Sequence, residues 1–168
     1  MKRGKLLELT VLALLGALMF GAKVAMAALP NIEPVTLLIL VYTVVFGKKA
    51  IYPIYLYVML EILIWGLGIW NLNYLYIWLV PFFLALALRK MESPWGWALI
   101  SGVFGLLFGL LCTPIYFLTG GWAYGLSWWV SGIPYDVMHC AGNFVLALVL
   151  VKPLSKGLKT LKTRYLPA

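Results

Sequence analysis

Long apolar runs separated by short polar turns restrict the folds open to this chain of 168 residues. A helix of about 17–25 apolar residues crosses the roughly 30 Å of bilayer hydrocarbon with its backbone polar groups satisfied internally. Hydrophobic residues make up 64% of the chain and charged residues only 11%, far from the composition of a soluble domain. We therefore expect an all-α membrane protein in which residues 1–168 form a single integral domain.

Six apolar segments can be marked, and the second and fourth are short. The second is long enough to cross only if it tilts or takes residues from the turn before it. The prediction is a bundle of six transmembrane helices at residues 6–28, 34–46, 50–70, 74–88, 95–118 and 126–151.

The start of the sixth helix has two interpretations. Either the helix begins at Leu126 and kinks at Pro134, or it begins at residues 131–134. In the second case Trp128 and Trp129 belong to an external loop that dips into the membrane interface. We favour the second interpretation, because proline suits the first turn of a helix.

Basic residues mark every second boundary between the segments. The other turns, residues 29–33, 71–73 and 119–125, carry no Lys or Arg, so the positive-inside rule predicts a multi-pass cell-membrane protein with both termini in the cytoplasm. Lys23 alone departs from this pattern. The predicted cytoplasmic clusters are Lys2, Arg3 and Lys5; Lys48 and Lys49; Arg89 and Lys90; and Lys152, Lys156, Lys159, Lys162 and Arg164.

The net charge of +8 is therefore a topology signal and a means of contact with the lipid bilayer, and it does not indicate nucleic-acid binding. The first segment also resembles a secretory signal peptide, with small residues at 25–27 as a cleavage site, and cleavage would leave five helices. Glu8 and Lys23 interrupt that run, so we expect a retained helix. Cys112 and Cys140 fall within apolar segments and imply no disulfide framework.

Two predicted helices carry a stripe of small residues on one face. Small side chains let helix backbones approach closely in lipid, where no hydrophobic drive brings helices together. The ordinary interpretation is packing inside the bundle, whereas two stripes in so short a chain also favour an external partner. The stripes are Ala13, Ala17, Gly21 and Ala25 in the first helix, and Ser101, Gly105 and Gly109 in the fifth.

Tryptophan is concentrated toward the predicted outer side. An interfacial belt would populate both membrane surfaces, so the excess indicates an aromatic cavity open to the exterior. The belt interpretation stays open, because these residues cluster where belts occur. The outer aromatic residues are Trp65, Trp70, Trp78, Trp122, Trp128, Trp129, Tyr74, Tyr76, Tyr116 and Tyr124.

Polar groups on the same side are few, and we expect them to orient a ligand. On the sixth helix Asp136, His139 and Asn143 share one face, and Glu61 is a further ionisable group in the third. Intramembrane ionisable residues are functional suspects. The alternative is that they satisfy one another through interhelical hydrogen bonds. The polar residues of the external turns are Asn31, Glu33, Asn71, Asn73 and Thr119.

No phosphate-binding loop, serine elbow, paired metal-binding histidines or close carboxylate pair is visible in the sequence. His139 and Cys140 are neighbours on a helix and point about 100° apart, which does not favour a shared metal. We therefore expect a protein that is not an enzyme, does not hydrolyse ATP and carries no cofactor or metal.

Three stretches together resemble the substrate-specific components of energy-coupling factor (ECF) transporters. They are residues 28–36 (ALPNIEPVT), 45–49 (VFGKK) and 132–139 (GIPYDVMH), and the resemblance extends over nearly the whole chain. It implies a subunit that binds a vitamin or metal ion in an outward pocket. It also implies partners, namely a membrane-embedded coupling protein and two cytoplasmic ATPases. The family's helix-one alanine motif docks on the coupling protein and maps here onto Ala13, Ala17 and, with glycine as a departure, Gly21.

Cobalamin is the best-matching substrate, because the motifs look most like the cobalamin branch and the charge-poor aromatic side suits a macrocycle with amide arms. Pyridoxamine, pantothenate or another small vitamin would use the same architecture. The expected substrate-binding residues are Asn31, Glu33, Asn71, Asn73, Tyr74, Trp78, Tyr116, Trp122, Tyr124, Trp128, Trp129, Asp136 and His139.

Two other classes of protein share some of these features. Tryptophan-rich membrane sensors that bind porphyrin-like ligands are also small and basic, but they have five helices. The sixth segment and the regular basic clusters favour the importer. A small membrane enzyme is the third alternative.

Overall fold

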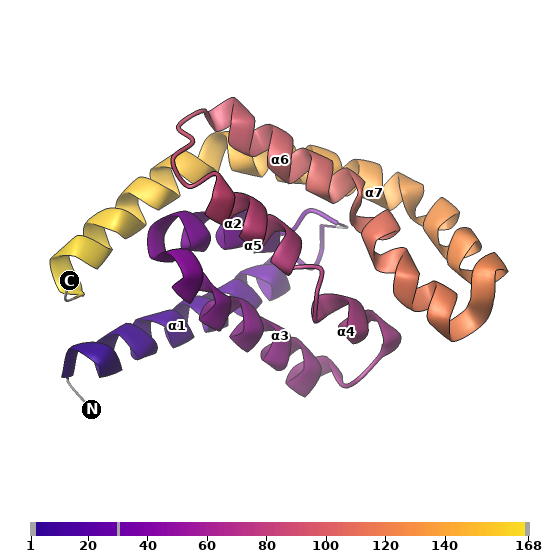
Figure 1. Ribbon diagram of the computed structural model, residues 1–168, viewed down its shortest axis with the longest axis horizontal. Coiled ribbons are helices and arrows are strands. Elements are labelled where there is room, and N and C mark those ends of the chain that lie inside the picture. The colour runs from indigo at the N-terminus through magenta and orange to yellow at the C-terminus, as the bar shows by residue number, and fades with distance from the viewer. Residues whose placement is uncertain (1–2, 30, 167–168) are drawn as a thin grey trace.

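The computed structural model describes residues 3–29 and 31–166, and all regular structure in that part of the chain is helical (Figure 1). Lys2 of the first basic cluster and Pro30 of the first motif lie outside the described residues. The elements are α1 (Arg3–Ala25), α2 (Val35–Phe46), the 3-10 turn η1 (Gly47–Ala50), α3 (Ile51–Trp65), α4 (Ile69–Tyr74), α5 (Leu79–Ala87), α6 (Pro94–Leu106) and α7 (Phe108–Tyr165).

Four helical stretches in the described chain are long and apolar enough to cross a membrane, namely Gly4–Ala25, Val35–Trp65, Ile69–Ala87 and Pro94–Tyr165. The expected all-α fold with membrane-spanning capacity is thus confirmed, but the predicted number of six helices is not supported. Two of these stretches each contain one predicted boundary, and the chain bends there without a long loop. Lys48 and Lys49 stand in η1, and residues 119–125 are helical apart from a kink at Gly121 (φ 78°). At both points a glycine with positive φ, Gly47 (61°) and Gly121 (78°), breaks the helical backbone, so each of these predicted boundaries coincides with a break between helices.

Two details of the predicted boundaries are wrong. The turn expected at residues 71–73 lies inside α4, and the chain turns instead at residues 66–68, where Gly66 has a φ of 82°. A helix that continues from the kink at Gly121 contains Trp128, Trp129 and Pro134, so neither proposed start of the sixth helix holds. Proline has no backbone N–H, so it leaves one carbonyl of the preceding turn without its helical hydrogen bond. Long apolar helices tolerate this loss, and Pro134 therefore does not mark a boundary.

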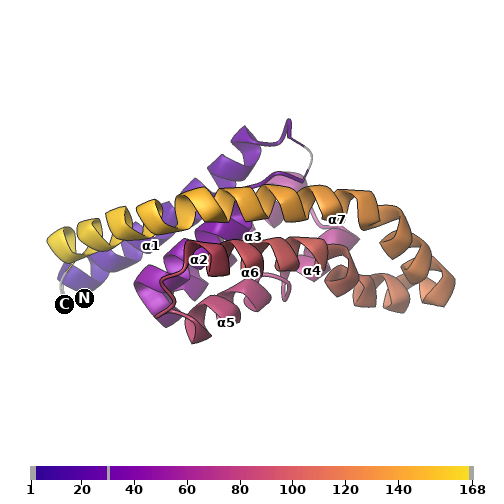
Figure 2. The same ribbon diagram turned by 90° about the horizontal axis from the view of Figure 1, so that it is seen from above.

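The basic clusters gather at one end of the molecule. The first and last described residues lie toward the same end, together with η1 and the loop between α5 and α6 (Figures 1 and 2). The described members of all four clusters belong to these elements. The arrangement agrees with the alternation of charge along the chain, while the assignment of this end to the cytoplasm stays a prediction.

Helix α2 lies at the centre of the packing. Eleven of its twelve residues are buried, the exception being Leu38, and it contacts α1, α5, η1 and α7. It has no charged residue, as expected of a helix enclosed on all sides. Around it, α1 packs on α3, and α6 packs along α7.

The two small-residue stripes have different environments. Ser101, Gly105 and Gly109 are buried against the far part of α7, and a Cβ atom built on Gly105 would lie 2.8 Å from the His139 carbonyl oxygen. In α1, by contrast, Ala17 is exposed, and a Cβ atom on Gly21 would meet nothing within 4 Å. The internal-packing interpretation therefore holds for the second stripe, and the first faces outward.

This contrast predicts opposite responses to the same substitution. Gly105→Ala should destabilise the protein by about 1–3 kcal/mol, because the new methyl group meets rigid backbone and forces α6 away from α7. Gly21→Ala should leave stability unchanged or raise it by up to about 1 kcal/mol, because alanine is the better helix former. Thermal unfolding of the two variants in one detergent measures the difference, and equal destabilisation would contradict this packing.

Candidate functional site

An open cavity of about 490 Å³ lies in the part of the molecule away from the basic clusters. The end of α1, the following loop, α3, α4 and α7 all contribute to its wall. Helix α7 contributes twice, from residues before the kink at Gly121 and from residues after it. The lining residues are Lys23, Val24, Met26, Ala27, Leu29, Asn31, Ile32, Glu33, Glu61, Trp65, Trp70, Asn73, Tyr74, Phe108, Cys112, Tyr116, Trp128 and His139.

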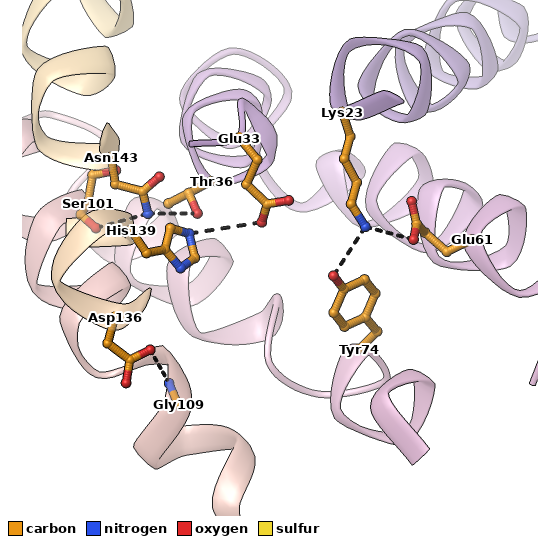
Figure 3. A network of polar contacts seen from close by, with 10 residues as sticks. All are labelled: Lys23, Glu33, Thr36, Glu61, Tyr74, Ser101, Gly109, Asp136, His139 and Asn143. Atoms are coloured by element: carbon orange, nitrogen blue, oxygen red, sulfur yellow. Dashed lines mark hydrogen bonds and ion pairs between the residues drawn. The ribbon is translucent and has the colours of Figure 1, made fainter. Parts of the chain in front are cut away.

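An ion pair on one wall explains why Lys23 departs from the charge pattern. Its Nζ lies 2.7 Å from Glu61 Oε2 and donates a hydrogen bond to the Tyr74 hydroxyl at 3.2 Å (Figure 3). The ammonium also lies 5.0 Å from the centre of the Tyr74 ring and 5.9 Å from that of Trp70, within cation–π range. Lys23 therefore neutralises a buried carboxylate, which accounts for its position outside the basic clusters.

A second polar group faces the cavity from the loop between α1 and α2. Glu33 Oε1 lies 3.9 Å from His139 Nε2, too far for a hydrogen bond (Figure 3). Burial raises the pKa of Glu33 to about 7, the negative charge of Glu61 adds to the rise, and the positive charge of Lys23 opposes it. The loop carboxyl therefore changes charge near neutral pH.

Several polar atoms of the cavity wall lack partners within the described chain. Glu61 Oε1 and His139 Nε2 are buried and make no hydrogen bond. Asn73 accepts a hydrogen bond from Tyr76 at 3.0 Å through its carbonyl oxygen, and no bond from its amide nitrogen is present among the described residues. Buried polar atoms are nearly always satisfied in stable proteins. Unpaired atoms around a cavity are therefore positions where a ligand can form hydrogen bonds.

Aromatic rings form much of the remaining wall. Tyr116 and Trp128 stack, with ring centres 3.8 Å apart and planes 16° apart, and join the two parts of α7 across the kink. Phe108 meets the His139 ring edge-on at 5.0 Å. Flat rings with a few convergent polar groups suit a planar ligand that carries hydrogen-bonding groups.

The three polar residues that share a face of α7 have different roles. His139 lines the cavity, whereas Asp136 accepts a hydrogen bond from the Gly109 N–H at 3.0 Å, close to the break between α6 and α7. Asn143 donates to Thr36 Oγ1 at 3.2 Å and to the Ser101 carbonyl at 3.3 Å, which ties three helices together. For Asp136 and Asn143 the interpretation as structural hydrogen bonds is therefore the better one.

Among the thirteen expected substrate-binding residues, the cavity brings together Asn31, Glu33, Asn73, Tyr74, Tyr116, Trp128 and His139. The other six lie elsewhere. Asn71 accepts a hydrogen bond from the Gly68 N–H at 2.6 Å, Trp78 is 1% exposed in the core, and Trp122 is 82% exposed. Tyr124, Trp129 and Asp136 are also absent from the lining.

Lys23 and Glu61 line the cavity but are not among the thirteen expected substrate-binding residues. The available signal was the position of one lysine outside every basic cluster together with one glutamate inside an apolar segment. Opposite charges isolated in lipid-spanning segments tend to pair, and here they do so at the cavity wall.

No protein-family model, curated protein or solved structure matches this chain. Within residues 3–29 and 31–166, no group of three or more His, Cys, Asp or Glu side chains lies close enough together to hold a metal ion.

The buried ion pair should couple more strongly than an exposed pair in the same protein. We expect a double-mutant cycle of Lys23→Met and Glu61→Gln to give about 2–3 kcal/mol of coupling, because removing either partner strands a charge in a poorly solvated wall. The matched pair Lys49–Glu8 has an N–O distance of 2.6 Å, but its lysine side chain is 55% exposed. Lys49→Met with Glu8→Gln should give less than about 1 kcal/mol. Chemical unfolding in detergent provides both values, and equal coupling would mean that water screens the cavity pair as fully as the surface pair.

Glu33 should make stability fall as pH rises toward neutral. Its carboxyl keeps a proton up to about pH 7 in the folded chain, whereas its ordinary pKa is 4.5, so the folded state binds the extra proton between these values. On reaching pH 8 the free energy of unfolding has therefore fallen by roughly 3 kcal/mol at most. Thermal unfolding at pH 5 and pH 8 should show a fall that Glu33→Gln removes. The exposed Glu92→Gln should keep the wild-type fall, and a Glu33→Gln profile identical to wild type would refute the effect.

Proposed function

We propose that this chain is the substrate-binding subunit of an ATP-driven vitamin importer of the ECF type. The cavity carries the proposal, because it combines aromatic walls with unpaired polar atoms on Glu61 and His139. Such a lining suits the binding of a ligand that carries hydrogen-bonding groups. The chain itself would not be an enzyme, and ATP hydrolysis would take place in partner subunits.

The chain would cross the membrane six times, with both termini in the cytoplasm. Two of the four spanning stretches double back, one through η1 and one at Gly121 of α7 (Figure 1). Each reversal turns one continuous stretch into two crossings. The basic clusters would then face the cytoplasm, and the cavity would open toward the exterior.

The outward stripe of α1 would dock on a membrane-embedded coupling protein that is joined to two cytoplasmic ATPases. Ala13, Ala17 and Gly21 are all exposed, and they form a smooth face on a helix that packs against α2 and α3 through other residues. Contact between small residues lets helices approach closely in lipid. Reorientation of the whole subunit against this partner would carry the loaded cavity toward the cytoplasm.

The volume of the cavity bears on which vitamin is carried. About 490 Å³ is typical of sites for drug-sized molecules. Pyridoxamine or pantothenate would fit inside, whereas cobalamin would insert only part of its structure and leave the rest at the mouth. The sequence resemblance favours cobalamin and the volume favours a smaller vitamin, so both belong in the test.

Calorimetric binding to the purified, detergent-solubilised chain tests this proposal. The panel contains cobalamin, cobinamide, pyridoxamine, pantothenate and a porphyrin. We expect one vitamin to bind, and Trp128→Ala or Asn73→Ala to weaken its binding by about tenfold, the value of one lost stacking or hydrogen-bonding contact. Trp122→Ala is the matched control, because that indole is 82% exposed outside the cavity, and it should bind as wild type does.

The results separate the alternatives. Porphyrin binding with no vitamin binding would favour the tryptophan-rich sensor. Binding that is unchanged in Trp128→Ala and Asn73→Ala would show that the ligand does not occupy this cavity. If the folded protein binds no member of the panel, the proposal that this chain binds a vitamin before it docks on its partner is wrong.

A further inference from the structure

A second cavity, of about 670 Å³, lies at the end of the molecule where the basic clusters gather. The loop between α5 and α6 forms one side, and the last third of α7 forms the other. The two cavities share no lining residue, so a ligand of this second cavity is independent of the vitamin in the first. The cations in its wall are Arg89, Lys90, Lys152, Lys156 and Lys159.

These five cations have no acidic partner in the described part of the chain. Among the described residues none of the five forms an ion pair, and Glu92 is the one carboxylate in the lining. Lys152, Lys156 and Lys159 are spaced four and three residues apart, so they project from one face of α7. Like charges at this spacing repel one another. A bound anion would relieve that repulsion.

Ser155 supplies an independent indication of a ligand. It belongs to the cavity lining and is only 6% exposed, and its hydroxyl makes no hydrogen bond within the described chain. A buried hydroxyl without a partner costs free energy, which an acceptor oxygen from a ligand would recover. The lysines need negative charge and the serine needs an acceptor, and phosphate oxygens provide both.

The cavity also presents apolar surface. Val44, Trp97 and Val151 line it, and the Trp97 indole donates a hydrogen bond to the Met91 carbonyl at 3.1 Å. Trp95, two residues before Trp97 on α6, is 65% exposed. A ligand that meets both the cations and this apolar surface has a phosphate head and hydrocarbon chains.

We propose that this cavity binds the phosphodiester headgroup of an anionic phospholipid. Arg89, Lys152 and Lys156 surround the phosphate, Ser155 donates to one of its oxygens, and the acyl chains lie along the outer face of α6 and α7. An acidic segment of a partner protein would satisfy the cations but would leave the apolar lining unused. A lipid bound here anchors this end of the chain at the level of the headgroups.

Native mass spectrometry of the full chain in detergent tests the site, with phosphatidylglycerol and phosphatidylcholine at equal concentrations. Phosphatidylglycerol should bind more tightly. Lys152→Gln and Lys156→Gln should each weaken it about fivefold, the effect of one cation at a membrane surface, and Ser155→Ala should also weaken it. Lys48→Gln is the matched control, an exposed lysine at the same end that is outside the lining, and it should bind as wild type does. Equal melting temperatures in phosphatidylcholine verify that the variants fold.

Four results would overturn the proposal. Equal binding of the two lipids, or equal loss in Lys48→Gln and Lys156→Gln, would show non-specific attraction. Displacement of phosphatidylglycerol by inorganic phosphate at matched concentration would indicate a site for a free anion. Tighter binding of a polyglutamate peptide than of the lipid would assign the cavity to an acidic protein partner. If the lysine variants do not fold, Ser155→Ala alone tests the site. This change removes only the hydroxyl oxygen from the wall, so weaker lipid binding would support the proposal and unchanged binding would contradict it.

Discussion

The close approach of α6 to α7 at Gly105 is the contact on which the cavity depends. No side chain separates the two helices there, so the His139 backbone lies within van der Waals reach of α6 and the imidazole is carried to the cavity wall. The same approach brings Asp136 to the backbone N–H of Gly109 and Asn143 to the Ser101 carbonyl. These hydrogen bonds satisfy polar groups that would otherwise be buried without partners. The absence of a side chain at Gly105 thus allows these hydrogen bonds to form.

Charge is divided between two environments. Twelve of the thirteen basic residues belong to clusters, and the described ones gather at one end, where water and lipid headgroups can solvate them. The thirteenth, Lys23, lies away from the clusters, where it pairs with Glu61, donates a hydrogen bond to Tyr74 and lies over the Tyr74 ring. The clusters need no particular partner within the chain. Lys23 does, because a cation removed from water requires a compensating charge at hydrogen-bonding distance.

The two cavities also differ in whether the charges in their walls are paired. The one beside Lys23 has paired charges, aromatic walls and unpaired acceptors, which suits a small ligand that is largely neutral or carries hydrogen-bond donors. The one beside Lys156 has unpaired cations and a buried hydroxyl, which suits an anion. The first cavity therefore suits the proposed role in substrate binding, and the second suits the proposed binding of an anionic phospholipid.

The sequence by itself determined the helical class, the capacity to span a membrane and the gathering of basic residues at one end, because backbone satisfaction in lipid and the hydration of charge act on every segment separately. It also indicated seven residues of the cavity wall, through the concentration of aromatic and polar groups in a few turns. Only the tertiary structure decided that a helix continues through Pro134, that one small-residue stripe is buried and the other exposed, and that Lys23 pairs with Glu61. These outcomes depend on which helix face meets which neighbour. Local composition is the same for a stripe that packs inward and one that faces outward, so only the packed arrangement separates them.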